Sequence, residues 1–147
     1  MSIVIDIADA VAAEINAGGV LPGVTAQRRV LPVFELEHLA ELKVTVVPKG
    51  VQITGSTRSA SQYDISVDIG VQRKLPPAPG NTDLDAEVAA LGSLVDEIAD
   101  YLRQRPLSQF PGAAWVSIAN EPVYAPEHLL EQRVFTSVLT VTYRALK

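Results

Sequence analysis

The chain has 147 residues, of which 48% are hydrophobic and 20% are charged, so it can form one domain with its own core and is not intrinsically disordered. Its net charge of −5 argues against a protein that binds nucleic acid mainly through Lys and Arg on phosphates. It contains no cysteine, which excludes a disulfide framework, a thiolate nucleophile and a cysteine-bound metal. The mean hydropathy of +0.20 indicates that part of the surface is apolar and meets a partner.

The N-terminal segment predicts an amphipathic helix over residues 3–16, although its first few residues could also be extended. Ile3, Ile7, Val11 and Ile15 recur at every fourth position, which places them on one helix face. A pair of glycines then ends the helix. The segment is acidic and lacks a basic start, and no apolar run in the chain approaches the ~20 residues of a membrane helix. We therefore expect an intracellular protein with neither a signal peptide nor a membrane span.

Short strands are predicted next. Residues 25–34 have strand character, and a proline within them indicates an edge strand or a bulge. Residues 35–41 form a connector, and residues 42–47 are a second strand. The Pro-Lys-Gly sequence at residues 48–50 predicts a turn, after which residues 51–54 form a short return strand.

A polar loop and a long strand follow. Residues 55–62, GSTRSASQ, predict an exposed and mobile loop. Residues 63–75 predict a strong strand, because apolar and polar side chains alternate along it. One face carries Tyr63, Ile65, Val67, Ile69 and Val71, and the other carries Asp64, Ser66, Asp68 and Gln72. The proline-rich residues 76–81 then predict a stiff linker.

The second half begins with the clearest helix, residues 82–103, which Pro106 stops. Its apolar stripe consists of Leu84, Val88, Leu91, Leu94, Ile98 and Leu102. Residues 113–119 predict a strand, and residues 121–131 a loop with a possible short turn. Residues 132–144 predict the last strand, since apolar and polar side chains alternate again. Its apolar face carries Phe135, Leu139, Val141 and Tyr143.

The order of helix, strands, long helix and strands predicts an α+β fold in a single domain spanning residues 1–147. We expect a mostly antiparallel β-sheet with two helices packed on one face. One helix is short and N-terminal, and the other is long and central.

Candidate catalytic and metal-binding side chains do not form a known constellation. His128 and Glu131 have the spacing of two ligands on one helix face, but a metal site needs further partners, and His38 has no local partner pattern. Asp64 and Asp68 share a strand face and could divide acid and base roles, yet carboxylates on a solvent face mostly provide solubility. Neither a phosphate-binding glycine loop nor an activated serine is indicated. We therefore expect no catalytic residue, no metal and no cofactor, and a protein that is not an enzyme.

The candidate interface residues are basic. They are Arg28, Arg29, Arg58, Arg73 and Lys74. The two adjacent pairs are either solvated strand ends or a charged patch that meets an acidic neighbouring subunit. Arg58 lies in the loop that we expect to become ordered on docking. The single tryptophan, Trp115, is either a core anchor or an interface anchor.

Three sequence segments resemble those of a known family. They are YDISVDIGVQRK at residues 63–74, DLDAEVAALGSLVDEIADYL at residues 83–102 and FTSVLTVTYR at residues 135–144. Together with the N-terminal helix, their order is similar to that of the tail terminator, or tail-completion, proteins of long-tailed bacteriophages. This resemblance covers most of the chain as an order of elements.

The resemblance implies a structural virion protein that assembles as a ring, typically a homohexamer, at the head-proximal end of a tail. It implies contacts with the tail tube protein and the neck connector, with DNA passing through the lumen. An acidic lumen would repel phosphates and keep the DNA from sticking. Three alternatives stay open. They are another neck or tail component, a non-catalytic adaptor that uses the edge of strand 25–34 for strand addition, and a small hydrolase or isomerase.

Overall fold

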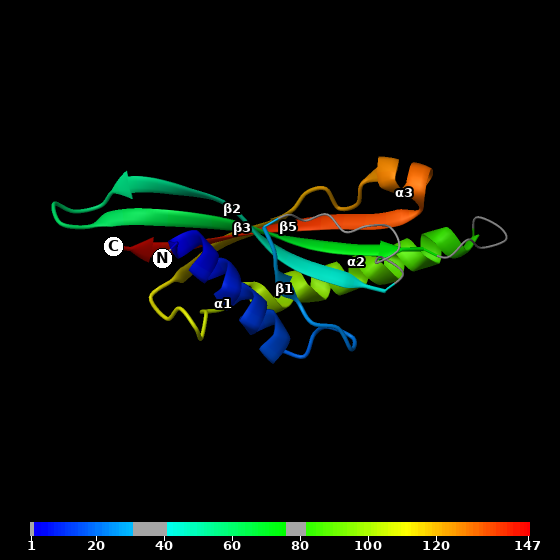
Figure 1. The fold of residues 1–147 in the computed structure, drawn as a ribbon, viewed down its shortest axis with the longest axis horizontal. Coiled ribbons are helices and arrows are strands. Elements are labelled where there is room, and N and C mark those ends of the chain that lie inside the picture. Colours follow the sequence, from blue (N-terminus) through cyan, green and yellow to red (C-terminus); the bar gives the residue numbers. More distant parts are fainter. Residues whose placement is uncertain (1, 31–40, 76–81) are drawn as a thin grey trace.

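A computed structural model describes residues 2–30, 41–75 and 82–147, and the fold is α+β (Figure 1). A five-stranded sheet has the order β1-β2-β3-β5-β4, in which β1 pairs with β2 in parallel and the other neighbours are antiparallel. The elements are α1 (Ile3–Ala17), β1 (Gln27–Arg28), β2 (Lys43–Gly55), β3 (Ser61–Lys74), α2 (Thr82–Leu102), β4 (Ala114–Asn120), α3 (Pro126–Gln132) and β5 (Val134–Leu146).

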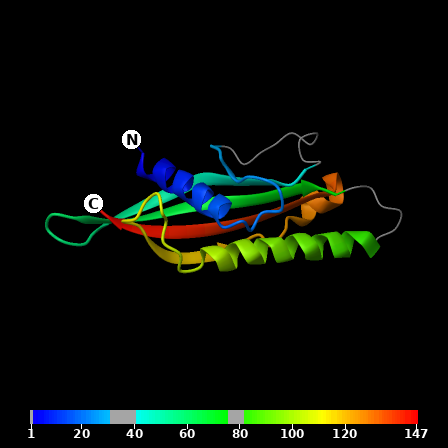
Figure 2. The same cartoon turned by 90° about the horizontal axis from the view of Figure 1, so that it is seen from below.

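Both predicted helices cover the same face of the sheet, as the sequence predicted (Figure 2). Helix α1 begins directly after Ser2, whose Oγ accepts the Ile5 N–H at 3.4 Å, so the first residues are helical and not extended. It ends at Ala17, and Gly19 has the positive φ of 66° that glycine adopts readily. Helix α3 adds a short third helix where the sequence indicated only a possible turn, and Pro126 stands at its start, where proline is favoured.

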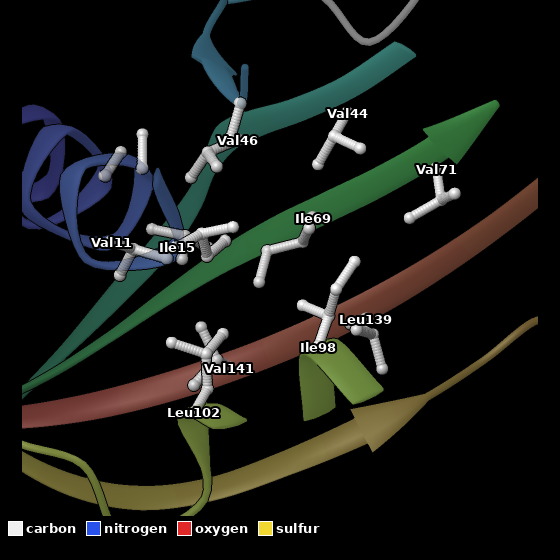
Figure 3. Close-up of a cluster of buried hydrophobic side chains, with 14 of the residues drawn as sticks. Val11, Ile15, Val44, Val46, Ile69, Val71, Ile98, Leu102, Leu139 and Val141 are labelled. Atoms are coloured by element: carbon white, nitrogen blue, oxygen red, sulfur yellow. The ribbon is translucent and has the colours of Figure 1, made fainter. Parts of the chain in front are cut away.

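The core lies between the sheet and these two helices (Figure 3). Side chains of α1 and α2 point at the strands, and the labelled helix residues are Val11, Ile15, Ile98 and Leu102. The predicted alternation of β3 and β5 is confirmed, because their apolar residues on the helix side are buried. The buried strand residues on this side include Ile65, Val67, Ile69, Val71, Phe135, Leu139, Val141 and Tyr143.

The turn predicted at residues 48–50 is wrong. Strand β2 continues through it to Gly55, with a register shift between Pro48 and Gly50. Among the described residues, strand β1 pairs with β2 only at Thr45 and Val46, so beyond that point β2 is the outer strand of the described sheet, where proline and bulges are tolerated. The residues expected to form a short return strand therefore belong to the same strand.

The polar loop is shorter than predicted, because Ser61 and Gln62 already belong to β3. Residues 56–60 connect β2 to β3, and the Ala60 N–H donates to Thr57 Oγ1 at 3.0 Å. In the predicted edge segment 25–34, only Gln27 and Arg28 form a strand among the described residues. The predicted connector 35–41 with His38 and the proline-rich linker 76–81 lie almost entirely outside the described residues.

Candidate assembly interface

The end of the β2–β3 hairpin projects beyond the helices, and we call residues 49–62 the arm (Figures 1 and 2). Val51 pairs with the buried Ile65, and Ile53 pairs with the half-buried Tyr63. Both pairs therefore lie on the helix side of the sheet. The arm extends beyond the N-terminal start of α1, and there Val51 is 41% exposed and Ile53 is 54% exposed.

The arm is also basic. Lys49 and Arg58 are its only charged residues, and both are exposed. Lys49 Nζ lies 3.8 Å from an oxygen of Asp68, which is a weak contact for an ion pair on the surface. Arg58 lies in the connection at the tip. The arm thus combines exposed aliphatic side chains with positive charge in a chain whose net charge is −5.

A second apolar surface lies between α2 and α3, and we call it the α2–α3 groove. It is a hollow of about 410 Å³. Its apolar lining consists of Leu84, Val88, Ala89, Tyr124, Pro126, Leu129 and Leu130. Leu130 is 85% exposed, and the adjoining Val123 is 57% exposed, so the groove presents uncovered hydrophobic surface. Such patches mark interaction sites more often than scattered single residues do.

One acidic side chain belongs to this groove. Asp85 of α2 lines it directly and is exposed. Helix α3, which supplies Leu129 and Leu130 to the groove, also carries the exposed Glu127 and Glu131. The groove thus contains the acidic Asp85 and lies on a helix pair with further acidic residues, whereas the arm is basic, and the two surfaces lie at opposite ends of the elongated molecule (Figures 1 and 2).

The face of the sheet opposite α1 and α2 is lined by polar side chains that pair across strands. Arg144 donates to both carboxylate oxygens of Asp64, at 2.8 and 3.2 Å, and Thr140 donates to Asp68 at 2.6 Å. The hydroxyl groups of Ser66 and Thr142 form a hydrogen bond of 2.9 Å. The hydrogen bond from Arg144 lowers the pKa of the Asp64 carboxyl group, burial opposes it, and the charge of Arg144 adds to the lowering. These groups stabilise one another across strands.

The candidate catalytic residues do not converge. His128 Nδ1 lies 2.9 Å from Thr136 Oγ1, and Thr136 is four residues along β5 from Thr140, the partner of Asp68. Four residues of strand span roughly 13 Å, and Asp64 is four residues farther along β3. Among residues 2–30, 41–75 and 82–147, no group of three or more His, Cys, Asp or Glu side chains is arranged to hold a metal ion.

The structure does not bring the five basic candidate residues into one patch. Arg28 Nε donates to Asp9 Oδ1 at 2.8 Å beside α1, and Arg29 follows it at the β1 edge. Arg58 is at the tip of the arm, whereas Lys74 ends β3 at the other end of the sheet. Arg73 lines a hollow together with the acidic Glu41 and Glu87 of its own chain. Of the five residues, only Arg58 belongs to the arm.

Trp115 is partly buried and packs against the core beside Tyr143, which fits the core interpretation. Sequence reasoning missed the apolar residues that mark the two exposed surfaces, namely Val51, Ile53 and Leu130. The sequence does contain a signal for the arm, namely the alternation of apolar and polar side chains in V-Q-I-T at residues 51–54, directly after the bulge. That alternation is the same in a covered strand and in an uncovered one, so the pattern alone does not distinguish them.

No protein-family model matches the sequence, and no curated protein is significantly similar to it. In the described part of the chain, no helix combines the length and the apolar character that crossing a membrane requires. The candidate site is therefore defined by its geometry: a basic apolar arm at one end of the molecule and an acidic apolar groove at the other.

Proposed function

We propose that this protein is a tail terminator of a long-tailed bacteriophage. In this proposal it forms a ring, typically a hexamer, that caps the tail tube at its head-proximal end and docks the neck connector. DNA passes through the lumen, and the acidic net charge disfavours retention of the DNA on the ring. The protein would act as a structural virion component and not as an enzyme.

The observation that carries the proposal is the presence of two uncovered apolar surfaces at opposite ends of one domain. Exposed hydrophobic surface of this kind is expected on a subunit whose neighbours cover it in an assembly. The order of elements adds support. An N-terminal helix, strand β3, the long α2 and the closing strand β5 follow one another in the order on which the resemblance to tail terminators rests.

A non-catalytic adaptor is the second candidate, and a feature of the sheet favours it. Strand β4 lies at one edge of the sheet, and its outer side pairs with no strand of the described chain. At the other edge, β1 pairs with only two residues of β2. A partner could add a strand to either edge through backbone hydrogen bonds.

Native mass spectrometry of the purified protein, with negative-stain images of the same sample, separates the two candidates. A closed ring is expected for the terminator, and incubation with isolated tail tubes should place it at one tube end. A monomer that stays monomeric and leaves tail tubes uncapped would contradict the proposal and favour the adaptor.

A further inference from the structure

We propose that the arm of one copy docks in the α2–α3 groove of the next copy, so that subunits associate head to tail. The inference rests on the proposed ring, because it names the contact through which neighbouring subunits would join. The partner is a second copy of this chain, and the contact joins Val51 and Ile53 of one molecule to the groove around Leu130 of another.

The two surfaces match in their apolar character. The arm presents Val51 and Ile53 on one face as a short ridge, whereas the groove offers a hollow of about 410 Å³ between two helices. Removing the apolar side chains of the arm and of the groove from water is favourable. A single molecule cannot bring them together, because the arm and the groove lie at opposite ends of the rigid sheet (Figures 1 and 2). Burial of both therefore requires another molecule.

Charge favours a copy of the same chain as that molecule. The arm carries Lys49 and Arg58 without any acidic residue, whereas Asp85 lines the groove and α3, which supplies Leu129 and Leu130 to it, carries the exposed Glu127 and Glu131. Opposite charges around an apolar contact speed association and fix its orientation. Two arms brought together, or two grooves, would instead place like charges side by side, which disfavours a two-fold symmetric contact.

The consequence for symmetry is direct. A contact between two different surfaces is heterologous, so every subunit offers one arm and one groove. Repeating the contact closes a ring if the rotation between subunits divides a full turn, and otherwise it builds a filament. An arm-to-groove contact is therefore of the kind that a ring needs.

Two substitutions test the contact from its two sides. Ile53→Asp places a charge on the apolar face of the arm, and Leu130→Asp places one in the groove. Both positions are largely exposed, so both variants should fold, as circular dichroism and thermal melting would verify. The matched controls are Gln52→Asp, on the opposite face of the arm, and Ser93→Asp, on an exposed position of α2 outside the groove.

Each variant alone should lose self-association by more than about tenfold in native mass spectrometry and analytical ultracentrifugation, while both controls associate like wild type. A 1:1 mixture of the two variants should form heterodimers and nothing larger. The Leu130→Asp molecules still carry an intact arm, the Ile53→Asp molecules still carry an intact groove, and one such contact leaves no further matching pair.

Cross-linking can detect an association that is too weak for the associated species to be isolated. The chain has no cysteine, so Ile53→Cys and Leu130→Cys each introduce a single thiol. A short bis-maleimide should join the two variants when they are mixed at high concentration, and neither variant to itself. Efficient coupling of Ile53→Cys to itself, or no mixed product at any concentration, would overturn the inference.

The outcomes for the contact and for the ring are distinguishable. Open filaments that both Asp substitutions abolish would support the arm-to-groove contact and argue against the proposed ring. Closed rings that neither substitution affects would support the ring and overturn this contact. Association lost in Ile53→Asp but unchanged in Leu130→Asp would overturn it too, since the arm would then dock somewhere other than the groove.

Discussion

The two halves of the β2–β3 hairpin carry similar side chains in opposite circumstances. In the half beneath α1, Val46 and Ile69 are paired on the helix side and are fully buried. In the arm, Val51 and Ile53 also face the helix side, and both are exposed. The sequence pattern and the strand pairing are alike, and the difference lies only in what covers the strands.

This difference separates the contributions of the two halves. Burial of aliphatic surface stabilises the fold in the covered half. In the arm the same surface stays in contact with water, so it contributes little to folding and remains available for association. A side chain removed from the covered half should therefore affect stability, and one removed from the arm should affect assembly.

One pair of variants tests this separation, and it has the largest expected effect on the free energy of unfolding. Ile69→Ala removes a fully buried side chain beneath α1 and should lower the free energy of unfolding by ~2–5 kcal/mol. Ile53→Ala removes the same atoms from the exposed arm and should change it by less than ~0.5 kcal/mol. Urea denaturation at low protein concentration, where association is minimal, measures both. Equal losses would mean that the arm is covered within the monomer.

A smaller effect is expected at Glu14, which holds α1 to the segment after α2. Its carboxylate is buried and accepts the Ser108 N–H at 2.9 Å, and Arg105 lies 3.8 Å away. Glu14→Ala should cost ~1–3 kcal/mol, because it removes the hydrogen bond between the charged carboxylate and the Ser108 N–H. The control Asp9→Ala breaks an exposed pair with Arg28 and should cost no more than ~1 kcal/mol. Thermal melting of both variants compares them, and a larger loss for Asp9→Ala would contradict the assignment.

Local sequence patterns predicted the fold class and the covered half well. The alternation in β3 and β5 and the apolar stripe of α2 indicated which side chains face the core. They did so because packing on one face imposes a period of two on strands and 3.6 on helices. The sequence also indicated the stop of α1 through its glycines, whereas at α3 it indicated only a possible short turn within a loop.

Features that depend on distant neighbours were not predictable in this way. Pro48-Lys49-Gly50 has the composition of a turn, and a bulge is acceptable there because no strand of the described chain pairs with the outer side of β2 at that point. The one-residue bulge also decides which residues of the arm face the helix side. The exposure of Val51 and Ile53 depends on where α1 begins along the sheet, and that is a tertiary property.

The groove was missed for a related reason. It is formed by α2 and α3, which are separated in sequence by strand β4, and neither helix has an unusual pattern by itself. Charge patterns in the sequence do not show which basic residues meet acidic groups of the same chain. In the structure, Arg28 pairs with Asp9, and Arg73 lies in a hollow with acidic residues of its own chain. Only the structure singles out Arg58 by placing it at the tip of the arm.

The smallest expected effect concerns the ion pair of Asp64 and Arg144, which lies where the covered half meets the arm. The pKa of Asp64 is below its usual value of 3.8, chiefly because Arg144 donates to the ionised carboxylate. A lowered pKa in the folded state means that the pair stabilises the protein above about pH 4 and that this contribution is lost as the pH falls through the lowered pKa. Partial exposure to solvent keeps the contribution small.

The variant Asp64→Asn should therefore be slightly less stable than wild type from about pH 5 to about pH 7, and the difference should vanish under acid conditions. Urea denaturation across this range measures it. In an Arg144→Gln background, Asp64→Asn should have little pH-dependent effect, because the group that lowers the pKa is gone. A difference that grew as the pH fell would contradict the sign of the pKa shift. Unchanged self-association in Asp64→Asn would show that the covered half and the arm can be altered independently up to their border.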